Sequence, residues 1–166
     1  MRTNTMETTA MAFEAMGATA ESIPYADLYV SLKTNVVDGQ DNPWINVRDR
    51  ELYKVQKYFT EVNYQFHPDP FYVNARWWNS LPKEFREILS DCAHEMGDYN
   101  DRLIDEGTQA AKEAIESSGA EIYVPSEDEM ARFREAMDPV YEWYVKEGIC
   151  TAEELAEMRR IVSEAD

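Results

Sequence analysis

Histidine and cysteine are scarce in this chain of 166 residues, which contains two of each. His67 and Asp69 lie close together, but one such pair is too few for a catalytic zinc site, which needs three protein ligands. The nucleophile elbow, the phosphate-binding loop and the dinucleotide fingerprint of common enzymes are also absent. The sequence therefore gives no support for an enzyme and predicts no metal or other cofactor.

The two cysteines, Cys92 and Cys150, are not spaced like metal ligands. Cys92 falls on the apolar phase of a predicted helix, which favours a free and buried thiol. A disulfide stays open as an alternative if the compartment is oxidising. His94 points elsewhere on the same helix, and we expect it at the surface.

Basic residues are also few, because 16 lysines and arginines face 33 acidic residues and leave a net charge of −17. A nucleic acid or an anionic membrane surface needs a basic face, so neither is an expected partner. An anionic ligand would need a local cationic clamp against this field. No run approaches the roughly 18 apolar residues of a membrane span, and the start, MRTNTMETTA, lacks the apolar region of a signal peptide. No direct insertion into a membrane is expected.

The hydrophobic content, 44%, is sufficient for a folded domain or for one lobe of a larger protein. Apolar spacing predicts helices over residues 4–16 and 26–34, another after Pro43, and two behind the capping boxes that begin at Ser126 and Thr151. Pro139 should kink the first of these last two helices. Residues 22–24 are expected to be a short extended piece, and strands are predicted over residues 36–37, 58–65, 71–77 and 121–124. This alternation of helices and short strands predicts the α/β class.

The clearest predicted element is a helix from about Pro82 to Ser118, ended by Gly119. Its apolar residues recur at steps of three and four, from Phe85 through Met96 to Leu103. At 1.5 Å per residue this helix is roughly 54 Å long, which exceeds the ~30 Å width of a small domain. We therefore expect this helix to be part of two separate structural units.

One short stretch, VVDGQDNP at residues 36–43, concentrates two carboxylates, two amides, a glycine and a proline. A turn explains most of it, since Asp38-Gly39 can supply a positive φ and Asn42-Pro43 favours turn initiation. The other interpretation is a binding site. Composition alone does not decide between the two.

The stretch and its neighbours resemble the signature region of solute receptors of tripartite ATP-independent periplasmic (TRAP) transporters, of the DctP type. Those receptors carry V-D-G-Q-E-N-P followed by a run similar to F-Y-E-V-Q-K-Y, and this chain has VDGQDNP and later ELYKVQKYF. The family's P-(F/Y)-x-(E/D)-(V/L)-Y motif is similar to PYADLY at residues 24–29. FYVNARWWNSLP at residues 71–82 resembles the segment that leads into the family's long helix. The resemblance covers about residues 2–145.

The resemblance implies a periplasmic receptor that binds a small carboxylate between two lobes and delivers it to membrane permease subunits. The family's carboxylate-binding arginine falls on Arg2 and its partner asparagine on Asn42. Tyr25 falls where the family has an aromatic pocket wall, and Tyr64 where it has a ligand-contacting residue. Further candidate contacts are Thr5, Gln40, His67 and Asp69, whereas Asp41 is expected at the rim.

The implied fold is one lobe of a type II periplasmic binding protein, with a long lobe-spanning helix and C-terminal helices, and with the N-terminal lobe largely absent. Residues 1–68 and 108–166 would form the second ligand-binding lobe, and residues 69–107 would belong with the first. That arrangement predicts uncovered apolar side chains at Phe71, Trp77, Trp78, Phe85, Ile88 and Met96. The alternative is an acidic helical interaction or structural module that binds no ligand.

Overall fold

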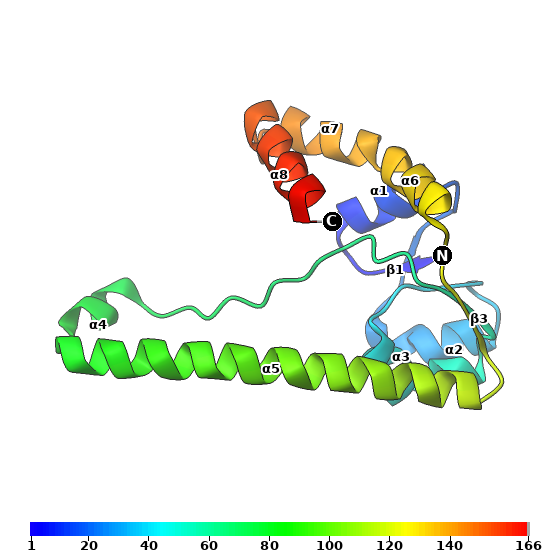
Figure 1. Cartoon of the computed structure of the whole chain (residues 1–166). Helices are drawn as coiled ribbons and strands as arrows, with labels where there is room; N and C mark the ends of the chain where they lie inside the picture. Colours follow the sequence, from blue (N-terminus) through cyan, green and yellow to red (C-terminus); the bar gives the residue numbers. More distant parts are fainter. Residues whose placement is uncertain (166) are drawn as a thin grey trace.

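The structure is a computed structural model, and it describes residues 1–165 (Figure 1). Its elements, in chain order, are β1 (Arg2–Thr3), α1 (Glu7–Ala15), β2 (Glu21–Ser22), η1 (Tyr25–Asp27), α2 (Leu28–Lys33), α3 (Trp44–Asp49), η2 (Leu52–Lys54), β3 (Tyr58–Thr60), α4 (Ala75–Ser80), α5 (Lys83–Ser117), β4 (Glu121–Tyr123), α6 (Glu127–Ala136), α7 (Asp138–Lys146) and α8 (Ala152–Ala165).

Two small parallel sheets organise these elements. In the first, β1 pairs with β2 in the register Arg2↔Glu21, and a single parallel bridge joins Arg2 to Gln40 on the other side of β1. In the second, β3 pairs with β4 in the register Phe59↔Ile122. Parallel neighbours need long crossover connections, and helices form these connections here. The α/β prediction is therefore confirmed.

The main core lies where α2, α3, the end of α5 and the second sheet meet. Its buried members are apolar and come from segments far apart in the sequence: Leu28, Leu32, Val37, Val47, Leu52, Phe59, Ile115 and Ala120. A smaller cluster joins α1 to α7 through Ala12, Met137 and Val140. Burial of these side chains fixes the two small sheets relative to the helices around them.

Helix α5 has a covered half and an uncovered half. Near its C-terminal end Ala111 and Ile115 are fully buried, and Gly107 lies so close to Ile45 of α3 that a Cβ there would be 3.0 Å from the Ile45 Cδ1. Toward α4 the helix projects away from the rest of the molecule (Figure 1). There Phe85 is 53% exposed, and the same face carries the exposed side chains of Ile88, Leu89, Met96, Tyr99 and Leu103.

An ion pair anchors the covered half of α5. Lys112 Nζ lies 2.6 and 2.7 Å from the two carboxylate oxygens of Glu61, directly after β3. The side chains of Lys112 and Glu61 are only 25% and 18% exposed. The same ammonium lies 5.3 Å from the ring centroid of Trp44 in α3. These contacts hold the beginning of segment 61–74 against α3 and α5.

The C-terminal helices begin where the sequence predicted. Ser126 and Glu129 form a complete capping box at α6, and Thr151 and Glu154 exchange the equivalent hydrogen bonds at α8. Instead of kinking one continuous helix, Pro139 lies in the first turn of a separate helix, α7. Proline is tolerated there because first-turn N–H groups have no intrahelical acceptor.

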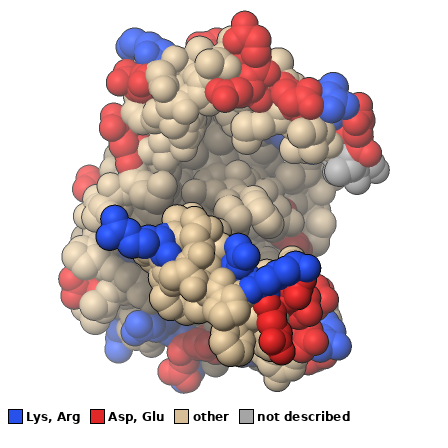
Figure 2. Space-filling model, turned by 90° about the vertical axis from the view of Figure 1, so that its left-hand side faces the viewer, with Lys and Arg blue, Asp and Glu red and all other residues tan. Residues whose placement is uncertain are grey.

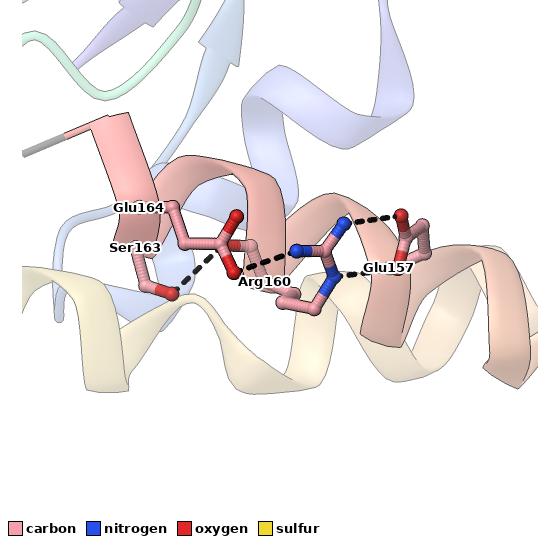
Figure 3. A network of polar contacts seen from close by, with 4 residues as sticks. All are labelled: Glu157, Arg160, Ser163 and Glu164. Carbon is pink, nitrogen blue, oxygen red and sulfur yellow. Dashed lines mark hydrogen bonds and ion pairs between the residues drawn. The ribbon is translucent and has the colours of Figure 1, made fainter.

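An exposed polar network lies on α8 (Figure 3). The guanidinium of Arg160 donates to Glu157 at 2.7 and 2.9 Å and to Glu164 at 2.6 Å, and the Ser163 hydroxyl donates to the Arg160 carbonyl oxygen. These are spacings of three and four residues, which place the side chains on one helix face. The hydrogen bond from Arg160 lowers the pKa of the Glu157 carboxyl.

The predicted strand at residues 36–37 is wrong. The N–H groups of Val36 and Val37 both donate to the Ser31 carbonyl oxygen, and Asn35 has a φ of 56°. These residues therefore cap the end of α2, whose last carbonyl oxygens need donors. Their N–H groups are used locally and cannot join a sheet.

Two other strand predictions are wrong in extent or type. The strand predicted at 58–65 stops at Thr60, since its partner β4 has only three residues. The strand predicted at 71–77 is extended chain as far as Asn74, whose side chain accepts a hydrogen bond from the Trp77 N–H at 3.1 Å and begins α4. Strand-like residues form a strand only beside a partner, and the described residues offer none here.

The prediction of a buried Cys92 is also wrong, because this thiol is free but exposed on the uncovered half of α5. An apolar phase on a helix leads to burial only where another element covers it. His94 is exposed, as expected. Among residues 1–165 no helix has the length and apolar character needed to cross a membrane.

Candidate ligand-binding site

The candidate site is built around Arg2, in β1 of the first sheet. The Arg2 N–H donates to the Gly39 carbonyl oxygen at 2.7 Å, so the chain around VVDGQDNP lies directly beside β1. The prediction of a positive φ at Gly39 is wrong, since the glycines with positive φ are Gly17, Gly119 and Gly148. A Cβ at Gly39 would lie 2.5 Å from the Met1 sulfur, so glycine permits close approach to the N-terminal residue instead.

Arg2 is a buried cation without a counter-charge among the described residues. It is 5% exposed, and its only side-chain hydrogen bond there runs from Nε to the Ile23 carbonyl oxygen at 2.9 Å. None of the ion pairs in residues 1–165 includes Arg2. A buried charge without a partner costs several kcal/mol. This arrangement is typical of a group that is reserved for an anion.

The ring of Tyr25 contacts two guanidinium groups. Its ring centroid is 5.7 Å from the guanidinium carbon of Arg2 and 4.7 Å from that of Arg50, which follows α3. Contacts of this length between a cation and an aromatic ring are attractive. The sequence analysis identified Arg2 and Tyr25 but missed Arg50, since only the fold brings α3 next to η1.

Gln40 and Asn42 project to the same side of their extended segment. The Asn42 Nδ2 donates to the Gln40 Oε1 at 2.5 Å. The backbone of Gln40 is bridged to Arg2. Side chains two residues apart along an extended chain share a face, and paired residues of neighbouring strands do so too. Arg2, Gln40 and Asn42 therefore belong to one face, where an arginine and two amides are available.

Asp41 projects the other way and binds Tyr64. The Tyr64 hydroxyl donates to the Asp41 Oδ2 at 2.7 Å, and the ring of Tyr64 packs edge-on against Phe13 of α1, with centroids 5.5 Å apart. Burial first, and then the hydrogen bond to Asp41, raise the pKa of Tyr64 well above its usual value. The hydroxyl therefore stays protonated as a donor and ties segment 61–74 to the first sheet.

The remaining candidates lie apart from this cluster. Thr5, His67 and Asp69 are exposed, the last two in the extended segment before α4. Within residues 1–165 no group of three or more metal-ligating side chains is assembled.

Seen along α5 from the α4 end, the surface is hollowed between the C-terminal helices and the α4–α5 end (Figure 2). Acidic side chains crowd the outer faces in that view, whereas mostly uncharged atoms line the hollow (Figure 2).

A family model provides the decisive comparison. The model for bacterial extracellular solute-binding protein, family 7 (DctP), matches residues 1–147. The chain belongs to this family. The C4-dicarboxylate-binding periplasmic protein DctP of Rhodobacter capsulatus is 30% identical over 129 residues, which are 77% of this chain and 39% of that protein. The 2,3-diketo-L-gulonate-binding periplasmic protein YiaO of Escherichia coli is 28% identical over 74% of this chain and 37% of its own length.

Solved structures of TRAP periplasmic solute-binding proteins share the fold of this chain over about half of their own length. A TRAP periplasmic solute-binding protein from Ochrobactrum anthropi has a TM-score of 0.84 and 28% identity, over 98% of this chain and 52% of that one. A second, from Chromohalobacter salexigens with bound D-glucuronate, has a TM-score of 0.81 and 25% identity, over 99% and 53%. The chain thus spans about half the length of these solved proteins. The named relatives are binding proteins and not enzymes, as the sequence predicted for this chain.

Proposed function

We propose that this chain is the ligand-binding portion of a TRAP transporter solute receptor for a small organic acid. The observation that carries the proposal is the burial of Arg2, a residue that is 5% exposed and has no acidic partner in residues 1–165. In a chain with a net charge of −17, a buried arginine would be expected to pair with a carboxylate of the protein, and the lack of such a pair calls for an explanation. An anionic ligand supplies it.

In this mechanism the planar guanidinium of Arg2 binds the ligand carboxylate through its Nη atoms, while Nε stays bonded to Ile23. The amide of Asn42 donates a further hydrogen bond, and the ring of Tyr25 forms one wall. Attraction is local, because the overall field repels anions. Exclusion of water on closure strengthens each of these contacts.

The names of the relatives support an organic acid as the ligand class. Three of those named above bind C4-dicarboxylates, 2,3-diketo-L-gulonate and D-glucuronate, respectively. All of these ligands carry a carboxylate, although the remainder of each molecule differs. We therefore assign the carboxylate to Arg2 and leave the distal part of the ligand to other residues. By the same relationship the receptor acts in the periplasm and passes its ligand to membrane permease subunits.

The uncovered half of α5 fits a receptor with two lobes. Residues 1–68 and those from 108 onward form the lobe described here, and residues 69–107 present the apolar face to the other lobe. Exposed apolar patches of this extent are unusual on a monomer and mark an interaction surface. The exposure of Phe71, Trp77, Phe85, Ile88 and Met96 supports this division.

The test is a titration of the chain with succinate and with glucuronate, followed by ¹⁵N NMR so that millimolar binding is detected. We expect both acids to shift the Asn42 side-chain amide resonance, which is present in wild type and in both variants below, and glucose, which has no carboxylate, to leave it unchanged. Arg2→Gln should abolish the response, whereas Arg159→Gln, an exposed arginine of α8, should retain it. Equal binding by wild type and Arg2→Gln would show that the clamp is assigned to the wrong residue.

A further inference from the structure

The hydrogen bond between Gln40 and Asn42 has a consequence for the candidate site. It joins the Asn42 Nδ2 to the Gln40 Oε1 at 2.5 Å. Gln40 is itself fixed to β1, through the parallel bridge to Arg2 and the 2.7 Å hydrogen bond from the Arg2 N–H to the Gly39 carbonyl oxygen. The position of the Asn42 amide is therefore set by the same backbone that carries Arg2.

We propose that Gln40 is a positioning residue that orients the Asn42 amide toward the carboxylate ligand. This inference rests on the proposed function. The NH₂ group of an asparagine amide donates hydrogen bonds and its carbonyl oxygen accepts them, and a 180° rotation of the amide exchanges the positions of the two groups. A carboxylate needs the donor, since an opposing carbonyl oxygen would repel it. In the structure the Gln40 Oε1 accepts from the Asn42 Nδ2, so the donating end of the Asn42 amide lies on the Gln40 side.

The chemistry leaves one donor free. Nδ2 carries two hydrogens, of which Gln40 accepts one, and the other remains for the ligand. In this role Gln40 need not touch the ligand itself. The role also explains why the amide side chains at 40 and 42 alternate with Asp41, whose carboxylate faces Tyr64 on the other side at 2.7 Å. The negative charge at 41 is thereby kept away from the bound anion.

Two substitutions separate this role from simple packing. Gln40→Met has a similar length but accepts no strong hydrogen bond, whereas Gln40→Glu still accepts one from Asn42. We expect the Asn42 side-chain ¹⁵N heteronuclear NOE to show an ordered amide in wild type and in Gln40→Glu, and a mobile amide in Gln40→Met. An Asn42 amide that is equally ordered in Gln40→Met overturns the proposal.

A double-mutant cycle with succinate as the probe tests the functional side. Gln40→Met should weaken binding about tenfold, the equivalent of one hydrogen bond. In an Asn42→Ala background it should have no further effect, because its action passes through Asn42. Additive losses would contradict the proposal, since they indicate separate roles.

The outcomes also separate this inference from the function on which it rests. Loss of succinate binding in Arg2→Gln together with full affinity in Gln40→Met would leave the carboxylate clamp in place and overturn only the role of Gln40. Absence of binding in wild type, for succinate and glucuronate alike, would overturn both.

Discussion

The guanidinium carbon of Arg2 lies 5.7 Å from the ring centroid of Tyr25, and Arg50 contacts the same ring at 4.7 Å. The sequence separates these three residues, and the first sheet, η1 and the end of α3 bring them together. Tyr25 thus contacts a buried cation that has no acidic partner among the described residues. We therefore expect Tyr25 to influence how the guanidinium of Arg2 is oriented toward the ligand.

Replacement of Tyr25 should therefore affect ligand binding more than folding. Tyr25→Leu removes a cation–π contact of about 0.5–2 kcal/mol and should weaken succinate binding by roughly 2- to 30-fold. Tyr25→Phe keeps the ring and should stay within about twofold of wild type. Calorimetric titration measures both, and Tyr58→Leu, at an exposed tyrosine of β3, is the matched control. Equal affinities for Tyr25→Leu and Tyr25→Phe would show that the ring contact is unimportant.

The same glycine substitution should have opposite signs at two sites, one inside the long helix and one at its end. Gly119, which follows α5, has a φ of 87°, and alanine there should destabilise the fold by about 1 kcal/mol. Gly97 lies inside α5, and a Cβ added to it would meet nothing within 4 Å, so alanine should stabilise the helix by about 0.5–1 kcal/mol. Urea unfolding of both variants measures the change in the free energy of unfolding. A change of the same sign in both would contradict the different backbone roles given to Gly119 and Gly97.

Loss of the Lys112–Glu61 ion pair should lower the free energy of unfolding. Lys112→Met leaves a largely buried carboxylate without its partner and removes the contact with Trp44, so we expect a loss of about 1–2 kcal/mol in the free energy of unfolding. The control is Lys83→Met, whose side chain is 81% exposed and pairs with Glu87. It should change stability by less than about 0.5 kcal/mol. Equal effects in chemical denaturation would contradict the anchoring role.

The capping box of α6 should respond to acid. Hydrogen bonds from Tyr123 first, and then from Ser126, lower the pKa of the Glu129 carboxyl to about 2. A folded-state pKa below the unfolded value means that the contribution to stability is present above the unfolded value, near 4.5, and is lost as the pH falls toward 2. The difference in melting temperature between wild type and Glu129→Gln should therefore shrink from pH 5 to pH 2.

The control for this pH dependence is Glu135→Gln, on the same helix but outside the capping box. Its difference in melting temperature from wild type should vary less with pH than that of Glu129→Gln. A constant difference between wild type and Glu129→Gln over the whole range would show that the box does not titrate in the folded state.

Local sequence signals predicted the helices well and the strands poorly. The extent of α5, the capping boxes at Ser126 and Thr151, and the helix start after Pro43 depend on residues within a few positions of one another. Strands depend on partners elsewhere in the chain, which is why Val36 and Val37 cap α2 and residues 71–74 remain unpaired. Cys92 was misplaced for the same reason, because burial requires a covering element.

The candidate site shows the same division. Arg2, Tyr25 and Asn42 were found through a resemblance to known receptors, and the alternation Gln40, Asp41, Asn42 is a sequence signal that could have predicted which two amides share a face. The contact of Arg50 with Tyr25 and that of Tyr64 with Asp41 carry no such local signal. They arise from the packing of α3 and of segment 61–74 against the first sheet.

By itself the sequence determined the α/β class, the acidic surface, the long helix and its caps, since composition and short-range spacing control these features. Tertiary structure alone decided that Gly39 admits Met1 rather than adopting a positive φ, that α5 is covered along only part of its length, and that Arg2 is buried without an acidic partner among the described residues. Each of these depends on which distant segments meet. Local spacing does not encode that.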